Sequence, residues 1–219
     1  MTKNRPRLAA ARRMMAKLVA AAPVAIRRGD ELRLDLEGPI GDRDPKTGKG
    51  IFAAPIEAAL KAHSDAQFVE ITIDSAGGAL DEAMKIYRAL RAARGFVTTT
   101  AGSQCSSAAS LILMGGDLRM AYAKSQILLH GVEIKGPPES ERQRWTAEKY
   151  TKLAQYIERS DKEIVDIYAK RGFFGREWFE RELKNENPLR IETAQACGII
   201  HCLAGEESRH ARTFGPGIR

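Results

Sequence analysis

The sequence predicts an α/β domain, in which strand-like and helix-like runs alternate along the chain. Residues 32–36 alternate apolar and polar side chains, which is typical of a half-buried strand. Residues 68–73 and 96–101 are mainly apolar or β-branched runs of strand length. Between these two runs, the apolar side chains of residues 81–94 recur every three or four positions, the spacing of an amphipathic helix.

The same two periodicities assign the other elements. Further strands are expected at residues 119–122, 126–130 and 199–200, and further helices at residues 51–63, 108–114, 140–171, 176–184 and 192–197. Glycine-rich turns separate several of them, as at residues 115–117. No internal repeat is present in the sequence.

The longest predicted helix, residues 140–171, follows a Gly-Pro-Pro loop. Its seam at steps of four and three comprises Trp145, Lys149, Leu153, Tyr156, Ser160, Ile164 and Ile167. Two interpretations fit this pattern. Either the helix projects and buries Leu153, Tyr156, Ile164 and Ile167 against another subunit, or it lies across its own domain.

Length and composition limit the classes of protein. The 219 residues, 43% of them hydrophobic, suit one globular domain at 31–205, after a basic lead-in at 1–30 and before a polar tail at 206–219. No apolar run approaches the roughly 20 residues that span a bilayer. The three cysteines form no zinc-like pattern, so we expect a reduced, cytoplasmic protein with no metal.

The net charge of +7 is concentrated in part near the N-terminus, where residues 3–13 carry five basic side chains and no acid. Such a segment suits a nucleic-acid arm, a targeting peptide or a solvated basic helix. No aromatic side chains interleave with these charges, so bases have no stacking platform. We therefore favour the solvated helix and expect no nucleic-acid partner.

Two short stretches and one histidine carry the groups that acyl transfer needs. Gly77 and Gly78 end one strand-like run, and glycine lets a backbone N–H approach a ligand closely. A serine-rich turn at residues 103–110 precedes a helix, whose N-terminus offers unpaired N–H groups. His130 ends another apolar run and is either a base or a structural histidine. Together these groups predict a nucleophile, a base and an oxyanion hole.

These residues resemble the ClpP family, the proteolytic subunits of Clp proteases, over residues 32–203. Ser75-Ala76-Gly77-Gly78 stands where the family has Ser-Pro-Gly-Gly. Leu118-Arg119, the run 127–130 and the segment 193–200 follow in the family's order. The resemblance implies the β-β-α superhelix shared with crotonases and a long projecting handle helix.

The resemblance also implies a role for particular residues. It places the nucleophile at Ser107, with Ser106 as the nearest alternative, and Ser110 as a packing residue one turn into the helix. His130 is then the base. The backbone N–H groups of Gly78 and of Ala108, the residue after the nucleophile, form the oxyanion hole.

The third member of the implied triad departs from the family. Counting back from Gly198 places Glu186 where the family has aspartate, and glutamate is one methylene longer. The flanking Asn185 and Asn187 are alternatives, because an amide can hold the imidazole by a neutral hydrogen bond. Glu186 is otherwise a solvated loop residue.

The expected function is therefore an ATP-dependent-Clp-type serine endopeptidase, acting on unfolded proteins or peptides in a homo-oligomeric ring. An AAA+ unfoldase is a candidate partner, and no cofactor or membrane is expected. Two alternatives remain: a crotonase-type acyl-CoA enzyme, which the ordered serine and histidine disfavour, and a non-catalytic ring subunit, which Glu186 keeps open.

Overall fold

The computed structural model describes residues 24–134, 139–142 and 144–205. Most of the predicted basic lead-in and all of the predicted polar tail lie outside these residues. The end of the lead-in, however, forms a strand, Val24–Arg28, which the sequence did not predict because two arginines interrupt its apolar run. This strand pairs antiparallel with the first predicted one.

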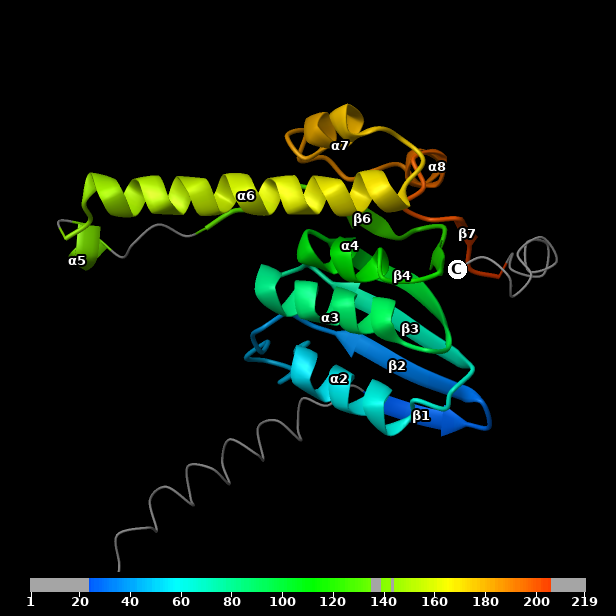
Figure 1. The fold of residues 1–219 in the computed structure, drawn as a ribbon. Helices are drawn as coiled ribbons and strands as arrows, with labels where there is room; N and C mark the ends of the chain where they lie inside the picture. The colour runs from blue at the N-terminus through cyan, green and yellow to red at the C-terminus, as the bar shows by residue number, and fades with distance from the viewer. Residues whose placement is uncertain (1–23, 135–138, 143, 206–219) are drawn as a thin grey trace, which may run out of the picture.

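A single sheet forms the centre of the described chain (Figure 1). Its strands are β1 (Val24–Arg28), β2 (Glu31–Glu37), β3 (Phe68–Ser75), β4 (Phe96–Ser106), β5 (Leu118–Ala121), β6 (Gln126–Leu128) and β7 (Cys202–Leu203). The order is β1-β2-β3-β4-β5-β7, with β6 also paired to β4. Apart from β1, all these pairs are parallel, as helical crossovers between strands require.

The helices are α2 (Ala53–Ala62), α3 (Leu80–Ala92), α4 (Ala108–Leu113), α5 (Glu139–Arg142), α6 (Ala147–Arg171), α7 (Arg176–Glu182) and α8 (Ile191–Ala196). In Figure 1, α2, α3 and α4 lie side by side along the sheet, and the C-terminal half of α6 lies next to α4. The N-terminal half of α6 extends beyond the sheet, with α5 at its far end. The mixed α/β fold with a long helix is confirmed.

The alternating pattern of β2 shows why these residues form a sheet with a buried face. Leu32, Leu34 and Leu36 are buried, while the residues between them are exposed. Burying a leucine side chain stabilises the fold by about 2 kcal/mol. These leucines join the core that α3 and α4 complete with residues such as Ile86 and Leu111.

The last short strand was predicted to begin at residues 199–200, and this start is wrong. Ile199 and Ile200 are buried, but the Ile200 N–H donates to Ala194 O in the turn that closes α8. The strand that pairs with β5 begins two residues later, at Cys202–Leu203. The apolar run predicted burial correctly but not which backbone groups pair.

The long helix begins later than predicted, because Thr146 caps α6 by accepting a hydrogen bond from Lys149 N–H. Its predicted seam divides into two parts. Ile164 and Ile167 are buried in the core of the same chain, so the prediction that they pack on another subunit is wrong. Tyr156 is 42% exposed and Leu153 is half-buried on the part that extends outward.

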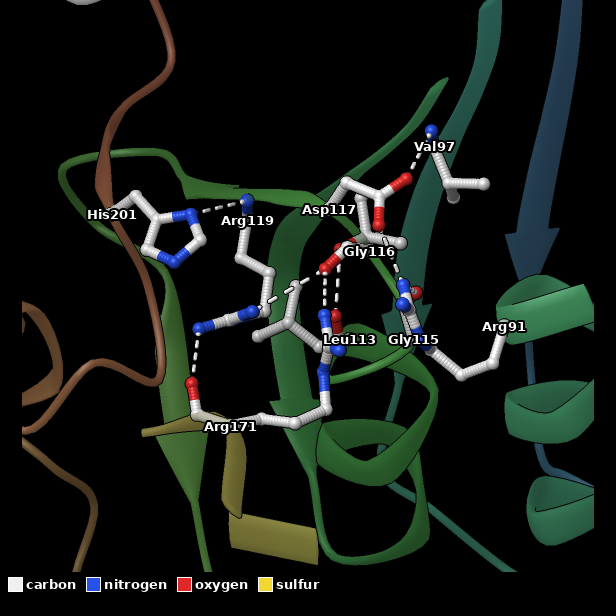
Figure 2. Close-up of polar contacts among 10 residues, drawn as sticks. Arg91, Val97, Leu113, Gly115, Gly116, Asp117, Arg119, Arg171 and His201 are labelled. Atoms are coloured by element: carbon white, nitrogen blue, oxygen red, sulfur yellow. Dashed lines mark hydrogen bonds and ion pairs between the residues drawn. The ribbon is translucent and has the colours of Figure 1, made fainter. Parts of the chain in front are cut away.

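A buried arginine, Arg119 on β5, bonds to the C-terminal ends of three helices, and Figure 2 shows its contacts with Gly116 and Arg171. Its guanidinium donates to the carbonyls of Gly116 after α4, of Arg171 at the end of α6, and of Gly198 and Ile199 after α8, at 2.7 to 3.3 Å. Helix C-termini carry partial negative charge, which stabilises a buried cation. Burial lowers the pKa of Arg119 to about 9, so the group stays charged at neutral pH.

Candidate active site

Ser107 lies at the sharp turn between β4 and α4, where the sequence placed the nucleophile. Its backbone has φ 56° and ψ −130°, a region that residues with a side chain rarely adopt. The Ser107 N–H donates to Leu128 O at 2.8 Å, which fixes the turn against β6. A strained serine between a strand and a helix is the geometry that exposes a nucleophile above a sheet.

Exposure separates Ser107 from its neighbours in the turn. Ser106 is 5% exposed and Cys105 is fully buried, whereas Ser107 is half-buried. Burial also raises the pKa of the Cys105 thiol far above its usual range, so that no thiolate forms at neutral pH. Access to substrate therefore favours Ser107 over the other two side chains.

The glycine loop lies directly against the serine turn. A Cβ added at Gly77 would be 2.7 Å from the Ser107 Cβ and 2.8 Å from Ser106 O, so no side chain fits there. Gly77 and Gly78 also have φ of 105° and 142°, in the range that glycine adopts without strain. The residue type at these two positions is therefore set by space and by backbone conformation.

Two backbone N–H groups in these touching segments are available to an oxyanion. Two backbone hydrogen bonds join the glycine loop to Ile40: the Ile40 N–H donates to Gly77 O, and the Ala79 N–H donates to Ile40 O. The Gly78 N–H takes part in neither bond. Ala108 is the first residue of α4, so its N–H has no partner within the helix. The oxyanion hole expected at these two N–H groups stays a prediction.

His130 follows β6, and the pairing of Leu128 with Ser106 brings this segment beside the serine turn. The His130 Nδ1 lies 2.6 Å from Gly131 O. Because a carbonyl oxygen only accepts, this contact favours the imidazole with its proton on Nδ1 and a free lone pair on Nε2. In the described chain His130 makes no hydrogen bond to Ser107.

Glu186 lies in the connection between α7 and α8, which runs beside the histidine segment. The Gly131 N–H donates to Leu183 O at 3.2 Å, and the Leu189 N–H donates to Ile127 O at 2.7 Å. Glu186 itself is exposed, with φ 50°. The connection flanks His130, but the described residues show no hydrogen bond from the Glu186 carboxylate to the ring.

The flanking amides are also exposed and bond within their own loop. Asn187 Nδ2 donates to Asn185 O at 2.8 Å and to Asn185 Oδ1 at 3.1 Å. Neither amide reaches His130 through a hydrogen bond of the described chain. The three sequence candidates for the third triad position thus share one loop, and none contacts the ring in this conformation.

Two polar residues of α6 that the sequence reasoning missed contact the site. Asp161 Oδ1 accepts from the Val132 N–H at 2.7 Å, two residues after His130. The buried Tyr168 hydroxyl lies 2.6 Å from Ser110 Oγ, which donates to Ser107 O at 2.5 Å. Ser110 is therefore a bonded part of the serine turn rather than packing alone. The sequence signal was weak, since α6 carries many charged residues.

Neither a metal centre nor a membrane span is evident in the part of the chain that the structure describes. No group of three or more His, Cys, Asp or Glu side chains is placed to hold a metal ion there. Among these residues, no helix is both long and apolar enough to cross a bilayer.

A parallel α/β sheet with a serine on a strained strand-to-helix turn, beside a glycine loop, is typical of hydrolytic enzymes. A family model described as Clp protease matches residues 53–207, more than half of the sequence. The chain belongs to the Clp protease family, and the family predicted from the sequence is confirmed.

Two relatives agree with this assignment. A protein of Pleurastrum terricola named ATP-dependent Clp protease proteolytic subunit is 29% identical over 150 residues, which cover 68% of this chain and 73% of the relative. A protein of Thermobifida fusca (strain YX) named ATP-dependent Clp protease proteolytic subunit 1 is 28% identical over 134 residues, covering 60% and 58%. The comparisons therefore indicate a protease and do not favour an acyl-CoA enzyme.

Proposed function

We propose that this chain is a serine endopeptidase of the ATP-dependent Clp type, with Ser107 as its nucleophile. The observation that carries the proposal is the left-handed backbone of Ser107, held between Gly77 and β6. Such strain is kept only where the surroundings enforce it, and an exposed nucleophile is its usual purpose. Family membership supplies the independent support.

In the proposed reaction, Ser107 Oγ attacks the carbonyl carbon of a peptide bond while His130 Nε2 takes the hydroxyl proton. The Gly78 and Ala108 N–H groups bind the oxygen that becomes negative. The imidazolium then gives its proton to the leaving amine, and water hydrolyses the acyl-enzyme by the same steps. The reaction requires His130 Nε2 to come within hydrogen-bond distance of Ser107 Oγ, a contact that apo sites commonly form only with substrate bound.

Glu186 belongs to this proposal as the charge on the loop that flanks His130. Its carboxylate stabilises the imidazolium when the loop closes toward the ring, with Asn185 and Asn187 as the neutral alternatives. Its exposure in the described conformation means that solvent screens the effect.

The outward half of α6 supports a ring assembly. Tyr150 and Tyr156 are 48% and 42% exposed on a helix that extends past the sheet. Large apolar side chains on an extended element favour burial against a neighbour. We propose that this half packs on a second copy, and that the ring encloses the Ser107 sites and admits unfolded chains. A cytoplasmic location and an AAA+ unfoldase partner complete the proposal.

Hydrolysis of peptide bonds tests the function. Purified wild-type protein should cleave an internally quenched peptide and an unfolded protein without added metal, and Ser107→Ala should cleave neither. Ser103→Ala, a change at an exposed serine near the end of β4, is the matched control and should retain activity. Cleavage that persists in Ser107→Ala would contradict the proposal.

A further inference from the structure

One peptide group stands between His130 and a carboxylate on α6. The carbonyl of Gly131 lies 2.6 Å from His130 Nδ1. The N–H of the same peptide group, which belongs to Val132, donates to Asp161 Oδ1 at 2.7 Å. The two ends of one peptide group are therefore occupied by the imidazole and by a carboxylate.

In a peptide group, a charge placed at the N–H changes the electron density on the carbonyl oxygen. A carboxylate that accepts a hydrogen bond from the N–H polarises the peptide group and raises the electron density on its carbonyl oxygen. That oxygen then becomes a better hydrogen-bond acceptor. That oxygen accepts the hydrogen bond from His130 Nδ1–H, so the negative charge of Asp161 acts on the ring indirectly, through the polarised peptide group. In the neutral ring this contact places the proton on Nδ1, which leaves the lone pair of Nε2 available to accept a proton.

The residue between them is one that allows the close approach. A Cβ at Gly131 would lie 3.3 Å from Asp161 Oδ1 and 3.4 Å from Oδ2, tighter than ordinary van der Waals contact. A larger residue would require the Asp161 carboxylate to shift by a few tenths of an ångström. The glycine, the carboxylate and the histidine therefore fit as one unit.

We propose that Asp161 is a positioning residue for His130, acting through the Gly131–Val132 peptide group to fix the ring's tautomer and to stabilise the imidazolium during acyl transfer. The inference rests on the proposed function. It assigns to α6 a role that the sequence analysis placed on Glu186, or on the flanking Asn185 or Asn187. Asp161 is half-buried and bonded in the described conformation, whereas Glu186 is exposed and reaches the ring only after a loop movement.

Other charged groups near the histidine segment need separate controls. Glu133 lies on the same segment, and Lys184 and Glu186 lie on the connection that bonds to it. From α6, Asp161 is the carboxylate that bonds to the segment. Glu158 is the matched control on the same helix, because it is exposed and pairs with Lys162.

The test measures kcat and KM against pH for the wild type and for Asp161→Asn, which keeps an oxygen acceptor for the Val132 N–H but removes the charge. We expect kcat to fall by about tenfold with KM unchanged. The acidic limb of the profile should move to lower pH, because the ring loses the charge that favours its protonated form. Glu158→Gln should match the wild type, and Glu186→Gln should shift the limb less than Asp161→Asn does.

A second measurement keeps the inference falsifiable without relying on the Asp161 variant. Nitrogen NMR of Ser107→Ala protein, with His130 assigned by its loss in Ser107→Ala/His130→Ala, should show the neutral ring protonated on Nδ1. The opposite tautomer would overturn the inference. So would an Asp161→Asn enzyme with a wild-type profile, and in that case the proposed function would stand. A wild-type protein without Ser107-dependent hydrolysis would overturn both.

Discussion

At the scale of single residues, Ser107 is held in a conformation that works against stability. Its φ of 56° and ψ of −130° suit glycine, and the strain of such a residue is on the order of 1–3 kcal/mol. The surrounding contacts maintain it, above all the bond from its N–H to Leu128 O. The nucleophile thus carries a cost that the rest of the fold offsets.

This strain predicts an unusual order of stabilities. Ser107→Gly should be more stable than Ser107→Ala by about 1 kcal/mol, since glycine relieves the strain but gains freedom in the unfolded state. Urea denaturation of the two inactive variants measures the difference. Ser110→Gly against Ser110→Ala, at a helical position in α4, is the control and should show the reverse order. A less stable Ser107→Gly would indicate that the turn is unstrained.

A second prediction at this scale concerns pH and His201. Burial, followed by the charges of Arg119 and Arg171, lowers the pKa of His201 to about 4. Between roughly pH 6.5 and 4, His201 is therefore protonated in the unfolded state and neutral in the folded state. Above this pH range the neutral His201 does not reduce the free energy of unfolding. As the pH falls through the range, protonation of His201 in the unfolded state lowers that free energy.

Asparagine offers a test, because its side-chain oxygen can replace His201 Nδ1 as the acceptor for the Arg119 N–H. The free energy of unfolding should fall less between pH 7 and pH 5 in His201→Asn than in the wild type. Equal losses in the two proteins would show that other groups cause the acid sensitivity. His63, the half-buried residue that ends α2, is the control position.

At the scale of elements, α6 contacts both halves of the site from one face. Asp161 and Tyr168 are seven residues apart, which is about two helical turns. The first bonds to the histidine segment and the second to the first turn of α4. Burial raises the pKa of Tyr168 well above its usual range, so its hydroxyl keeps its proton for this bond.

Removing the Tyr168 hydroxyl should loosen the serine turn. Tyr168→Phe should destabilise the fold by about 1 kcal/mol and lower kcat, because Ser110 loses one of its two partners. Tyr156→Phe removes an exposed hydroxyl from the same helix. Its bond to Asp81 Oδ1 is long, at 3.5 Å, so this change should affect neither quantity. Thermal melting and peptide hydrolysis of the two variants decide the matter, and equal behaviour would contradict the role of Tyr168.

The elements also show what the sequence could predict. The strands at 68–73 and 96–101 were found because apolar and β-branched runs mark buried strands. Strand β1 was missed because edge strands tolerate charges such as Arg27 and Arg28. Thr146 begins α6 through a local cap that periodicity does not reveal.

The candidate site divides in the same way. Ser107, Gly78 and His130 were assigned from short patterns of residue types together with the resemblance to the ClpP family, and their catalytic roles stay predictions. Asp161 was not, since its contact with Val132 joins segments 29 residues apart and depends on how α6 packs. Glu186 has the position that the family resemblance implies, but spacing alone does not indicate which way a loop carboxylate points.

At the scale of the whole molecule, the division of the α6 seam sharpens the prediction of a ring. Leu153→Glu/Tyr156→Glu should give folded, smaller assemblies, because these positions lie on the outward half of the helix. Ile164→Glu should instead unfold the chain, since it buries a charge in the core. Light scattering and circular dichroism separate the two results. A wild-type protein that remains monomeric at high concentration would contradict the ring.

The central claim is that Ser107 is an activated nucleophile, and labelling with a fluorophosphonate tests it most directly. Mass mapping of the modified peptide should find one labelled residue, Ser107, in the wild type. Labelling should disappear in Ser107→Ala and nearly disappear in His130→Ala. The losses of activity in the two variants should not be additive, because the two residues act as one unit. A label on Ser106, or an unlabelled wild-type protein, would contradict the account.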